Sequence, residues 1–205
     1  MNESTKYPTS SSPALGAFTS AYRTLLEKGA TAVLSIHLSA KLASTYNNAI
    51  VAAKSVARSA QLDLPLETIL REITDLSKRT YAYATVNTLK YLHLGGRISQ
   101  IAAGFGSLLQ IRPVLHLHAG QIGIDLVRTS RQSLDKLVTS LLSLGPLERL
   151  SIVHTNAKDE VQRLAESVAD LLPDQKAFYV VDVSPAIGVH FGPGAVGFAA
   201  IKAAP

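Results

Sequence analysis

Helical and strand-like patterns alternate along the second half of the chain. Apolar residues at helical spacing predict helices at 130–144 and 158–172. Runs rich in apolar and β-branched residues predict strands at 149–155, 177–183 and 195–201. Interleaved helices and strands are typical of a mixed α/β fold, which we expect here.

The residues before this region continue the alternation. Pro65 opens a helix whose apolar face is formed by Leu66, Ile69, Leu70, Ile73 and Leu76. "YAYATV" then predicts a strand, "NTLKYLHLGGRIS" a short helix broken by a glycine pair, and "QIAAGFGSLL" a helix packed through small residues. "IRPVLHLHAGQIGIDLVR" predicts a β-hairpin across Ala119 and Gly120.

The beginning of the chain predicts a smaller α-β-α unit. Ser12 as N-cap and Pro13 at the first helical position predict a helix that Gly29 ends. "TAVLSIHL", residues 31–38, predicts a buried strand, and a second helix follows at 44–60. Composition and punctuation change near 62–66, so we expect domains at 1–64 and 65–205.

Apolar residues make up 47% of the chain, and the mean hydropathy is +0.19. No uninterrupted apolar run approaches the ~18 residues of a membrane span. Apolar content without such a run indicates a larger core, an oligomer interface or a cavity for an apolar ligand.

The chain contains no cysteine, which excludes disulfides, thiolate metal sites and a cysteine nucleophile. The start "MNESTKYPTSSSP" has neither the basic nor the apolar region of a signal peptide, so we expect a cytoplasmic protein. The net charge is +5, but the basic residues are spread along the chain. This distribution indicates no nucleic-acid partner and leaves anionic small ligands or headgroups open.

Two expected helix N-termini carry clustered hydroxyls. "PTSSSP" holds Thr9, Ser10, Ser11 and Ser12, and "SAKLASTY" holds Ser39, Ser44 and Thr45. Free N–H groups and the helix dipole favour a carboxylate or a phosphate at such ends. The alternative is that these side chains only cap their helices.

Arginines and histidines gather in the second half: His93, Arg97, Arg112, His116, His118, Arg128, Arg131, His154 and His190. Gly96 and Arg97 form a reasonable anion contact, although Arg97 could equally be a solvated residue after a helix end. His116 and His118 share a strand face without a third ligand at suitable spacing, so we expect no metal. No P-loop, GxGxxG or GxSxG motif is present, so nucleotide or hydrolase chemistry is not indicated.

"VHFGPGAVGFA" sets His190 against Gly192, Pro193 and Gly194. Glycine permits positive φ and close approach of the backbone to a ligand. Such a turn either carries chemistry or reverses the chain.

Six ordered segments resemble one family. They are "PTSSSPALGAF", "SIHLSAKLASTY", "NTLKYLHLGGRIS", "GSLLQIRPVL", "LVRTSRQS" and "PAIGVHFGPGAVG". Together they resemble motifs of the DegV family of bacterial fatty-acid-binding proteins. No single one of these motifs is specific to the family, but all six in the family's order, from Pro8 to Gly197, are specific together.

The resemblance implies a two-domain α/β fold that holds one long-chain fatty acid in an apolar tunnel between the domains. A separate fatty acid kinase would phosphorylate the bound carboxylate with ATP, and the acyl phosphate would pass to phospholipid synthesis at the membrane surface. The protein would then be a carrier, with no catalysis and no cofactor of its own.

By matching position, Ser10 replaces the carboxylate-binding Thr of the family, and Ala43 stands where the family has a second carboxylate-binding Ser. Ser44 would have to supply that lost contact. Arg128 and His190 match basic residues near the carboxylate or phosphate, with His190 aimed by the glycine turn. The resemblance and the spacing together give these ligand-binding candidates: Thr9, Ser10, Ser44, Thr45, Gly96, Arg97, Arg128, His190, Gly192 and Gly194.

Compared with the family pattern, the chain lacks the usual N-terminal strands and a strand-helix segment between Ala60 and Pro65. We therefore expect a reduced N-terminal α/β domain beside a nearly complete, mixed-sheet C-terminal domain. The unpaired sheet edge predicts a homodimer or self-association. Two alternatives to a lipid carrier stay open: a scaffold or interaction protein that no longer binds lipid, and a transferase with His190 as its base.

Overall fold

The computed structural model describes residues 7–38, 40, 43–57, 66–97, 111–171 and 178–204. The chain forms two compact units. The small unit is Ser11–Asp75, and the sheet unit is Met1–Ser10 together with Leu76–Pro205. The expected boundary between residues 64 and 65 lies outside the described residues and stays a prediction.

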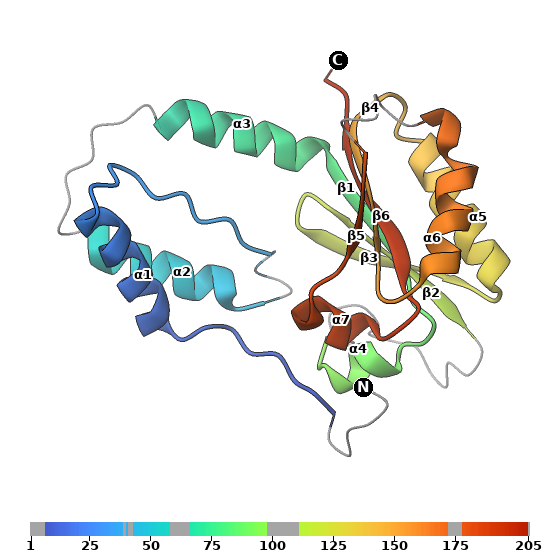
Figure 1. The fold of residues 1–205 in the computed structure, drawn as a ribbon, viewed down its shortest axis with the longest axis horizontal. Coiled ribbons are helices and arrows are strands. Elements are labelled where there is room, and N and C mark those ends of the chain that lie inside the picture. Colours follow the sequence, from blue (N-terminus) through green and yellow to red (C-terminus); the bar gives the residue numbers. More distant parts are fainter. Residues whose placement is uncertain are drawn as a thin grey trace. The chain divides into compact units, whose positions relative to one another are not determined.

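The sheet unit is built on a six-stranded sheet (Figure 1). Its order is β3-β2-β1-β6-β4-β5, and all neighbours are antiparallel except β4 and β5. The strands are β1 (Thr80–Thr85), β2 (Arg112–His118), β3 (Gln121–Val127), β4 (Leu147–His154), β5 (Phe178–Asp182) and β6 (Val196–Lys202). The mixed sheet and every strand predicted from residue 80 onward are confirmed.

The hairpin of β2 and β3 turns at Ala119 and Gly120, as predicted. Their φ angles are +46° and +73°, and two consecutive residues with positive φ match the right-handed twist of the flanking strands. The pairing of His118 with Gln121 leaves just these two residues in the loop.

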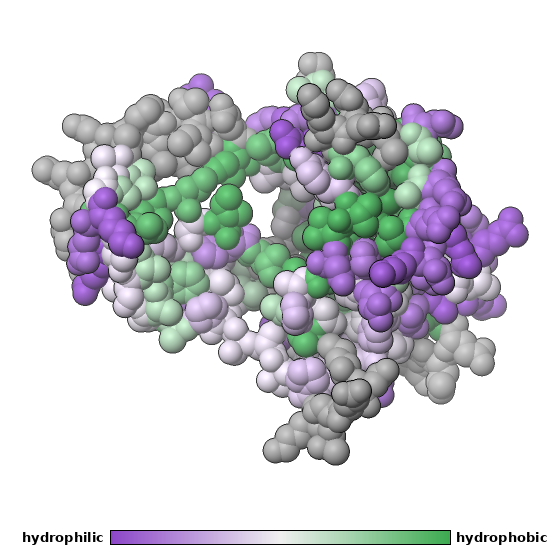
Figure 2. Space-filling view, in the orientation of Figure 1, coloured by the Kyte–Doolittle hydropathy of each residue, from purple (hydrophilic) through white to green (hydrophobic). Residues whose placement is uncertain are grey.

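One face of the sheet is covered by α5 (Ser130–Leu142) and α6 (Lys158–Ser167). Thr129 and Gln132 form a reciprocal capping box that begins α5. The main core lies between these helices and the sheet and includes Val114, Leu137, Leu141, Leu150, Ile152, Leu164 and Phe198. The outer face of α6 is hydrophilic, whereas hydrophobic residues gather over the edge strand β5 (Figure 2).

The end of the predicted helix at 158–172 differs from the structure. The α-helix stops at Ser167, and Ala169–Leu171 form a separate 3₁₀ turn. The helix predicted for "QIAAGFGSLL" lies outside the described residues.

The other face of the sheet carries a second, smaller core of Val86, Leu89, Leu92, Leu115 and Ala195. It is covered by α4 (Lys90–Leu94) and is bordered by α7 (Pro185–Phe191). The predicted short helix before the glycine pair is confirmed as α4. The sequence pattern placed His190 in the glycine turn itself, which is wrong. His190 lies in the last turn of α7, and the glycine turn comes after it.

The small unit contains α1 (Leu15–Glu27), α2 (Thr45–Ala57) and most of α3 (Leu66–Arg79), whose last four residues belong to the sheet unit. Tyr22, Ala52 and Val56 form its core. Ser12 is not the N-cap of α1: Ala14 holds that position, and the Ser12 hydroxyl bonds Ser44 instead.

The strand predicted at 31–38 is also not formed. Residues 31–38 run as a stretched-out segment (Figure 1), but a strand needs a neighbour, and no described residue pairs with them. In the part of the chain that the structure describes, no helix is long and apolar enough to cross a membrane.

Gly197→Ala should strongly destabilise the sheet unit. A Cβ at residue 197 would lie 2.0 Å from the Tyr83 carbonyl oxygen and 2.6 Å from the Ala84 Cα, so β1 and β6 would have to separate. We expect a loss of about 2–4 kcal/mol in the free energy of unfolding, measured by urea denaturation.

Gly188→Ala is the matched control within the sheet unit. Its added methyl group would meet only the Thr155 Cγ2 atom, at 3.8 Å. Unfolding free energies that change equally for the two variants would contradict the assigned strain at residue 197.

Candidate functional site

Several strand ends meet at one edge of the sheet. Thr85 pairs with both Val114 and Val196, and Val196 also pairs with His154. His154 in turn pairs with Asp182, the last residue of β5. The segments that leave β1, β3, β4 and β5, or that enter β2 and β6, therefore gather at this edge, which also receives α7.

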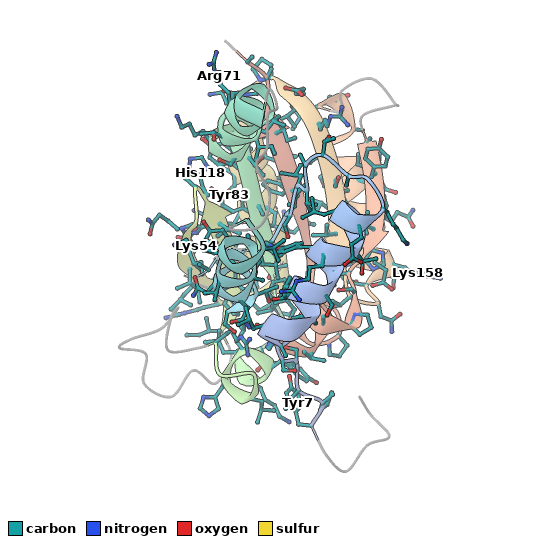
Figure 3. The ribbon with its side chains drawn as sticks, turned by 90° about the vertical axis from the view of Figure 1, so that its left-hand side faces the viewer. Tyr7, Lys54, Arg71, Tyr83, His118 and Lys158 are labelled. Atoms are coloured by element: carbon teal, nitrogen blue, oxygen red, sulfur yellow. The ribbon has the colours of Figure 1, made fainter. Side chains whose placement is uncertain are left out.

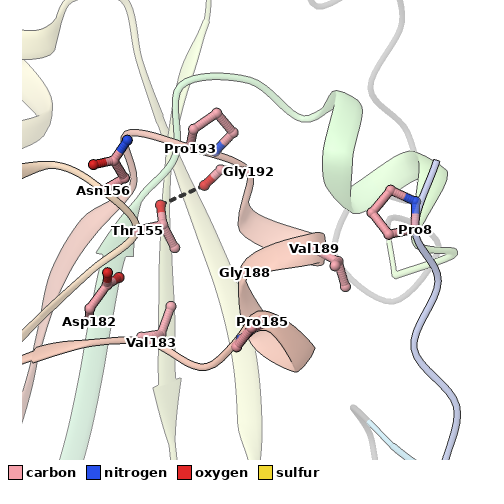
Figure 4. A pocket seen from close by; sticks show the side chains of 10 residues that line it. All are labelled: Pro8, Thr155, Asn156, Asp182, Val183, Pro185, Gly188, Val189, Gly192 and Pro193. Atoms are coloured by element: carbon pink, nitrogen blue, oxygen red, sulfur yellow. Dashed lines mark hydrogen bonds between the residues drawn. The ribbon is translucent and has the colours of Figure 1, made fainter. Parts of the chain in front are cut away.

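Buried Thr155 fixes the turn between α7 and β6. Its hydroxyl donates to the Gly192 carbonyl oxygen at 2.6 Å (Figure 4). The same hydroxyl accepts from the Ala195 N–H at 2.9 Å. Its carbonyl oxygen accepts from the Gly194 N–H at 2.7 Å, and its own N–H donates to the Ala195 carbonyl oxygen at 2.9 Å. Thr155, the residue after β4, thus holds the turn that follows His190 through its N–H, its carbonyl oxygen and its hydroxyl.

The two glycines of this turn are required by backbone shape and by space. Gly192 and Gly194 have φ of +74° and +81°. A Cβ would lie 2.1 Å from the Tyr91 ring at residue 192 and 2.3 Å from the Asn87 Nδ2 atom at residue 194. The glycines therefore allow α4 and the end of β1 to pack closely against the turn, which is a sufficient structural reason for both.

His190 meets Ser10 at the centre of the candidate site. The Ser10 hydroxyl lies 2.7 Å from the His190 Nε2 atom, and the tautomer of the ring decides which of the two donates. Residues 180 positions apart in the sequence are thereby joined within the sheet unit. The structure brings together the two candidates that the sequence placed at opposite ends of the chain.

Gly95 provides the surface on which the His190 ring lies. A Cβ at residue 95 would be 2.1 Å from the His190 Nδ1 atom, so only glycine fits there. Nδ1 is buried and has no hydrogen-bond partner among the described residues. The Nε2 edge is consequently the side of the ring that hydrogen-bonds to Ser10.

Arg97 adds positive charge beside this ring. Its guanidinium donates to the Gly95 carbonyl oxygen at 2.5 Å. Burial lowers the pKa of His190, and the charge of Arg97 lowers this pKa further. A neutral imidazole beside a fixed cation is a setting in which a bound anion would favour protonation of His190.

Gly96 has a different structural role. Its φ is +71°, its N–H donates to the His93 carbonyl oxygen, and the Arg97 N–H donates to the Leu92 carbonyl oxygen. This is a Schellman ending of α4, and it directs Arg97 back toward Gly95. Contact of Gly96 with a ligand stays a prediction.

Tyr7 fastens the N-terminal segment to α7 and α4. Its hydroxyl donates to the Val189 carbonyl oxygen and lies 3.4 Å from the Tyr91 carbonyl oxygen, and Figure 3 shows Tyr7 beside α4. Burial, followed by the neighbouring Tyr91, raises the pKa of Tyr7, so its hydroxyl stays a donor. Because Tyr7 lies three residues before Ser10, this anchor helps to place Ser10.

Arg112 and Arg128 lie at the same edge of the sheet. Arg112 pairs with Val127 across the hairpin, and its guanidinium donates to the Asn87 Oδ1 atom. The Asn87 Nδ2 group donates to the Pro193 carbonyl oxygen at 3.2 Å. Arg128 directly follows Val127, is exposed, and uses its backbone N–H on Gln132. Among the described side chains none forms a recorded bond with the Arg128 guanidinium.

The hydroxyl candidates at α2 form a separate cluster in the small unit. The Ser12 and Ser44 hydroxyls lie 2.8 Å apart, and the Thr45 hydroxyl donates to the Ser12 hydroxyl at 3.1 Å. Ala43 supplies no hydroxyl. Thr9 is exposed in the sheet unit.

A cleft of about 550 Å³ lies between α7 and the segments at the ends of β4 and β5 (Figure 4). Its lining combines the Asp182 carboxylate and the Asn156 amide with apolar walls from Pro8, Val183, Pro185, Val189 and Pro193. Asn156 has a φ of +48°, which asparagine tolerates better than most residues.

Two other strand histidines, His116 and His118, make structural contacts. The His118 ring stacks on Tyr81 at 3.9 Å and lies 3.0 Å from the Thr80 carbonyl oxygen. His116 packs against Gly123, near Asp125. Within the described ranges no group of three or more metal-ligating side chains occurs.

A family model described as "Uncharacterised protein, DegV family" matches residues 1–64 and 51–203. The chain belongs to the DegV family. The match comes in two pieces that overlap at residues 51–64, where the sequence pattern indicated a missing segment.

Bacterial DegV relatives align along nearly the whole chain. A DegV domain-containing protein of Halalkalibacterium halodurans is 32% identical over 225 positions, which cover 94% of this chain and 77% of the relative. One from Streptomyces coelicolor is also 32% identical and covers 92% and 76%. Because the first alignment is longer than the 205-residue chain, the relative has residues inside the aligned region that this chain lacks.

Solved structures confirm the DegV fold. A structure titled fatty acid binding of a DegV family protein from Thermus thermophilus has a TM-score of 0.81 and 27% identity, covering 98% of this chain and 81% of that one. A fatty acid binding DegV family protein from Streptococcus agalactiae has a TM-score of 0.84 at 22% identity, with 99% and 81% covered. The fatty acid kinase B3 protein of Streptococcus pneumoniae, loaded with linoleic acid, has a TM-score of 0.78 at 16% identity, with 99% and 81% covered.

Sequence reasoning missed four residues that build this site: Tyr7, Asn87, Gly95 and Thr155. Gly95 belongs to the glycine pair noted in the sequence, but only Gly96 of that pair was predicted to bind a ligand. The other three act by contacts between distant segments, which no local pattern signals.

His190 should titrate below the ordinary histidine pKa of 6.5. The unfolded chain would then bind a proton more readily than the folded one. The stabilisation from neutral His190 is therefore complete above pH ~6.5 and is lost as the pH falls through the lower folded value. The measurement is an NMR titration of the His190 ring protons.

Arg97→Gln should raise the pKa of His190 without fully restoring it, because burial is the larger cause. Arg131→Gln, on the exposed start of α5, is the control and should leave the titration unchanged. A His190 that titrates at or above 6.5 would refute the buried, Arg97-flanked environment.

Proposed function

We propose that the chain binds a long-chain fatty acid and presents its carboxylate to a fatty acid kinase. The observation that carries the proposal is the pair formed by the Ser10 hydroxyl and the His190 Nε2 atom, with Arg97 beside it. Both groups can donate to a carboxylate once it draws a proton onto His190. Solved relatives described as fatty-acid-binding proteins support the choice of ligand.

A carboxylate would enter a site prepared for negative charge. Tyr7 and Thr155 hold the segments on either side of Ser10 and His190, so their geometry is set before a ligand arrives. The Arg97 charge that disfavours protonated His190 would instead attract the anion. The charge of Arg97 therefore disfavours protonated His190 in the free protein and favours binding of the anion.

The kinase step would leave the acyl group on its carrier. A carboxylate oxygen attacks the γ-phosphorus of ATP, the bond from phosphorus to the bridging oxygen breaks, and ADP leaves. The product is an acyl phosphate with more negative charge than the fatty acid. Exposed Arg128, at the same edge of the sheet, is the residue that we assign to this added charge.

The chain itself is proposed to be a carrier and not an enzyme. Its carboxylate contacts would hold and orient the ligand, while the kinase supplies the nucleotide and the transfer chemistry. One solved structure of the same fold, the fatty acid kinase B3 protein, is loaded with linoleic acid.

A scaffold that no longer binds lipid is the second candidate. Ala43 removes the hydroxyl expected at its position, and the Ser44 hydroxyl already bonds Ser12. Under this alternative the Ser10 and His190 pair is a structural contact of the sheet unit. Lipid binding by the protein decides between the two functions.

Ser10→Ala should weaken fatty acid binding. A hydrogen bond to a charged group contributes about 1.5–3 kcal/mol, so we expect the Kd for oleate to rise by ~10–100-fold. Extraction and mass spectrometry of gently purified protein should show a co-purified fatty acid in the wild type and less in the variant. Titration with oleate then gives the Kd.

Ser143→Ala is the control, because that exposed hydroxyl bonds only the Ser140 carbonyl oxygen at the end of α5. It should bind oleate as the wild type does. A wild-type protein that purifies without lipid and takes up neither oleate nor palmitate would remove the carrier function and leave the scaffold.

Arg128→Ala should impair the kinase step more than binding. The acyl phosphate and its transition state carry more negative charge than the carboxylate, so loss of a cation costs more there. We expect turnover by a purified fatty acid kinase with ATP to fall by ~10-fold or more while the Kd for oleate changes little.

ADP release measured over a range of carrier concentrations checks this expectation. Arg131→Ala, three residues further along the chain and also exposed, is the matched charge control. Equal effects of the two variants would show that only net charge matters and would refute the role of Arg128.

A further inference from the structure

Residues 31–38 of the small unit have the side-chain pattern of a strand. The side chains of Val33, Ser35 and His37 contact α1: Val33 packs on the small-unit core, the Tyr22 hydroxyl donates to the Ser35 hydroxyl at 2.9 Å, and His37 meets the Phe18 ring edge to face. The Ser35 hydroxyl also lies 2.5 Å from the His37 Nε2 atom, as expected for side chains two residues apart on one face of an extended segment.

The alternate residues form an exposed apolar row. Leu34 is 49% exposed, Ile36 is 79% exposed and Leu38 is 52% exposed. Three large aliphatic side chains that alternate with anchored ones give this extended segment one packed face and one uncovered face. Such an uncovered row is unfavourable in water unless another surface covers it.

Among the residues that the structure describes, the backbone of this segment also has no partner. Across the described residues, no backbone hydrogen bond is recorded for residues 31–38, whereas Ala30 just before them donates to Leu25. An extended segment with free N–H and C=O groups is a template for another strand. The relative from Halalkalibacterium halodurans has internal residues without a counterpart here.

We propose that this segment pairs with the same segment of a second copy of the chain, as antiparallel strands centred on Ile36. Centring on Ile36 sets Ile36 opposite Ile36, and Leu34 opposite Leu38, in both directions. All three exposed aliphatic side chains then gain an apolar cross-strand neighbour.

A second copy suits this surface because the segment complements itself. "TAVLSIHL" contains no lysine, arginine, aspartate or glutamate, so two copies meet without repulsion between like charges although the whole chain carries +5. Ser35 falls opposite His37 on the packed face, a polar side chain against a polar side chain. The interaction is isologous, so it closes at a dimer.

The first test uses the absence of cysteine in the natural chain. In Ile36→Cys the two new side chains would face each other across the two-fold axis. Directly opposed residues of antiparallel strands have Cα atoms about 4.5–5.5 Å apart, which lies within the range that a disulfide spans. We expect rapid formation of a covalent dimer under mild oxidation.

Val51→Cys is the matched control, since Val51 lies on α2 of the same unit and is 53% exposed. It should form covalent dimers only slowly, through random collisions. Cross-linking of Ile36→Cys that is no faster than that of Val51→Cys would overturn the proposed register.

The second test needs no covalent bond. Wild-type protein should be dimeric by analytical ultracentrifugation, and Ile36→Lys should be monomeric because two lysines would face each other. Thermal melting of the lysine variant checks that it folds, and hydrogen exchange should show protection of alternate amides within residues 32–38 only in the dimer. A monomeric wild type, or a dimer that survives Ile36→Lys, would overturn the proposal. Neither result would decide whether the protein binds fatty acid, which the oleate titration tests separately.

Discussion

The bonds of one buried threonine determine where the last helix of the sheet unit can lie. Thr155 follows β4, and it holds the backbone at Gly192, Gly194 and Ala195 before β6 begins. Without these bonds the chain could enter β6 in the same register, but the exit of α7 would be held less firmly, by contacts such as that of the Asn87 amide with the Pro193 carbonyl oxygen. The position of His190 relative to Ser10 therefore depends on a residue that never touches either of them.

This arrangement leaves little space for added side-chain atoms around the imidazole. Gly95 lies under the His190 ring, and Gly192 lies against the Tyr91 ring. Each contact is set by a missing Cβ, so the glycines act through the space they leave. In the small unit, by contrast, the hydroxyls of Ser12, Ser44 and Thr45 bond one another and would have to exchange partners to accept a ligand.

Local patterns predicted those elements whose causes are local. Residue spacing predicted the two-residue turn at Ala119 and Gly120, the end of α4 at the glycine pair, and the strands of the six-stranded sheet. The Ser-Pro signal was less reliable, because Ser12 and Pro13 do not begin α1. The strand predicted at 31–38 failed for another reason, because strand formation depends on a partner that its own sequence cannot reveal. Only the family resemblance indicated that Ser10 and His190 belong to one site, because no local sequence pattern links residues so far apart in the chain.

The position of β6 has a consequence for how the protein is made. β6 joins β1 to β4 at the middle of the sheet, yet it is synthesised more than a hundred residues after β1. On the ribosome, β1, β2 and β3 can assemble early, but β1 then offers an open edge until β6 emerges. The nascent chain is consequently exposed to misassociation for much of its synthesis, and a factor that shields β1 during this interval would raise the yield of folded protein.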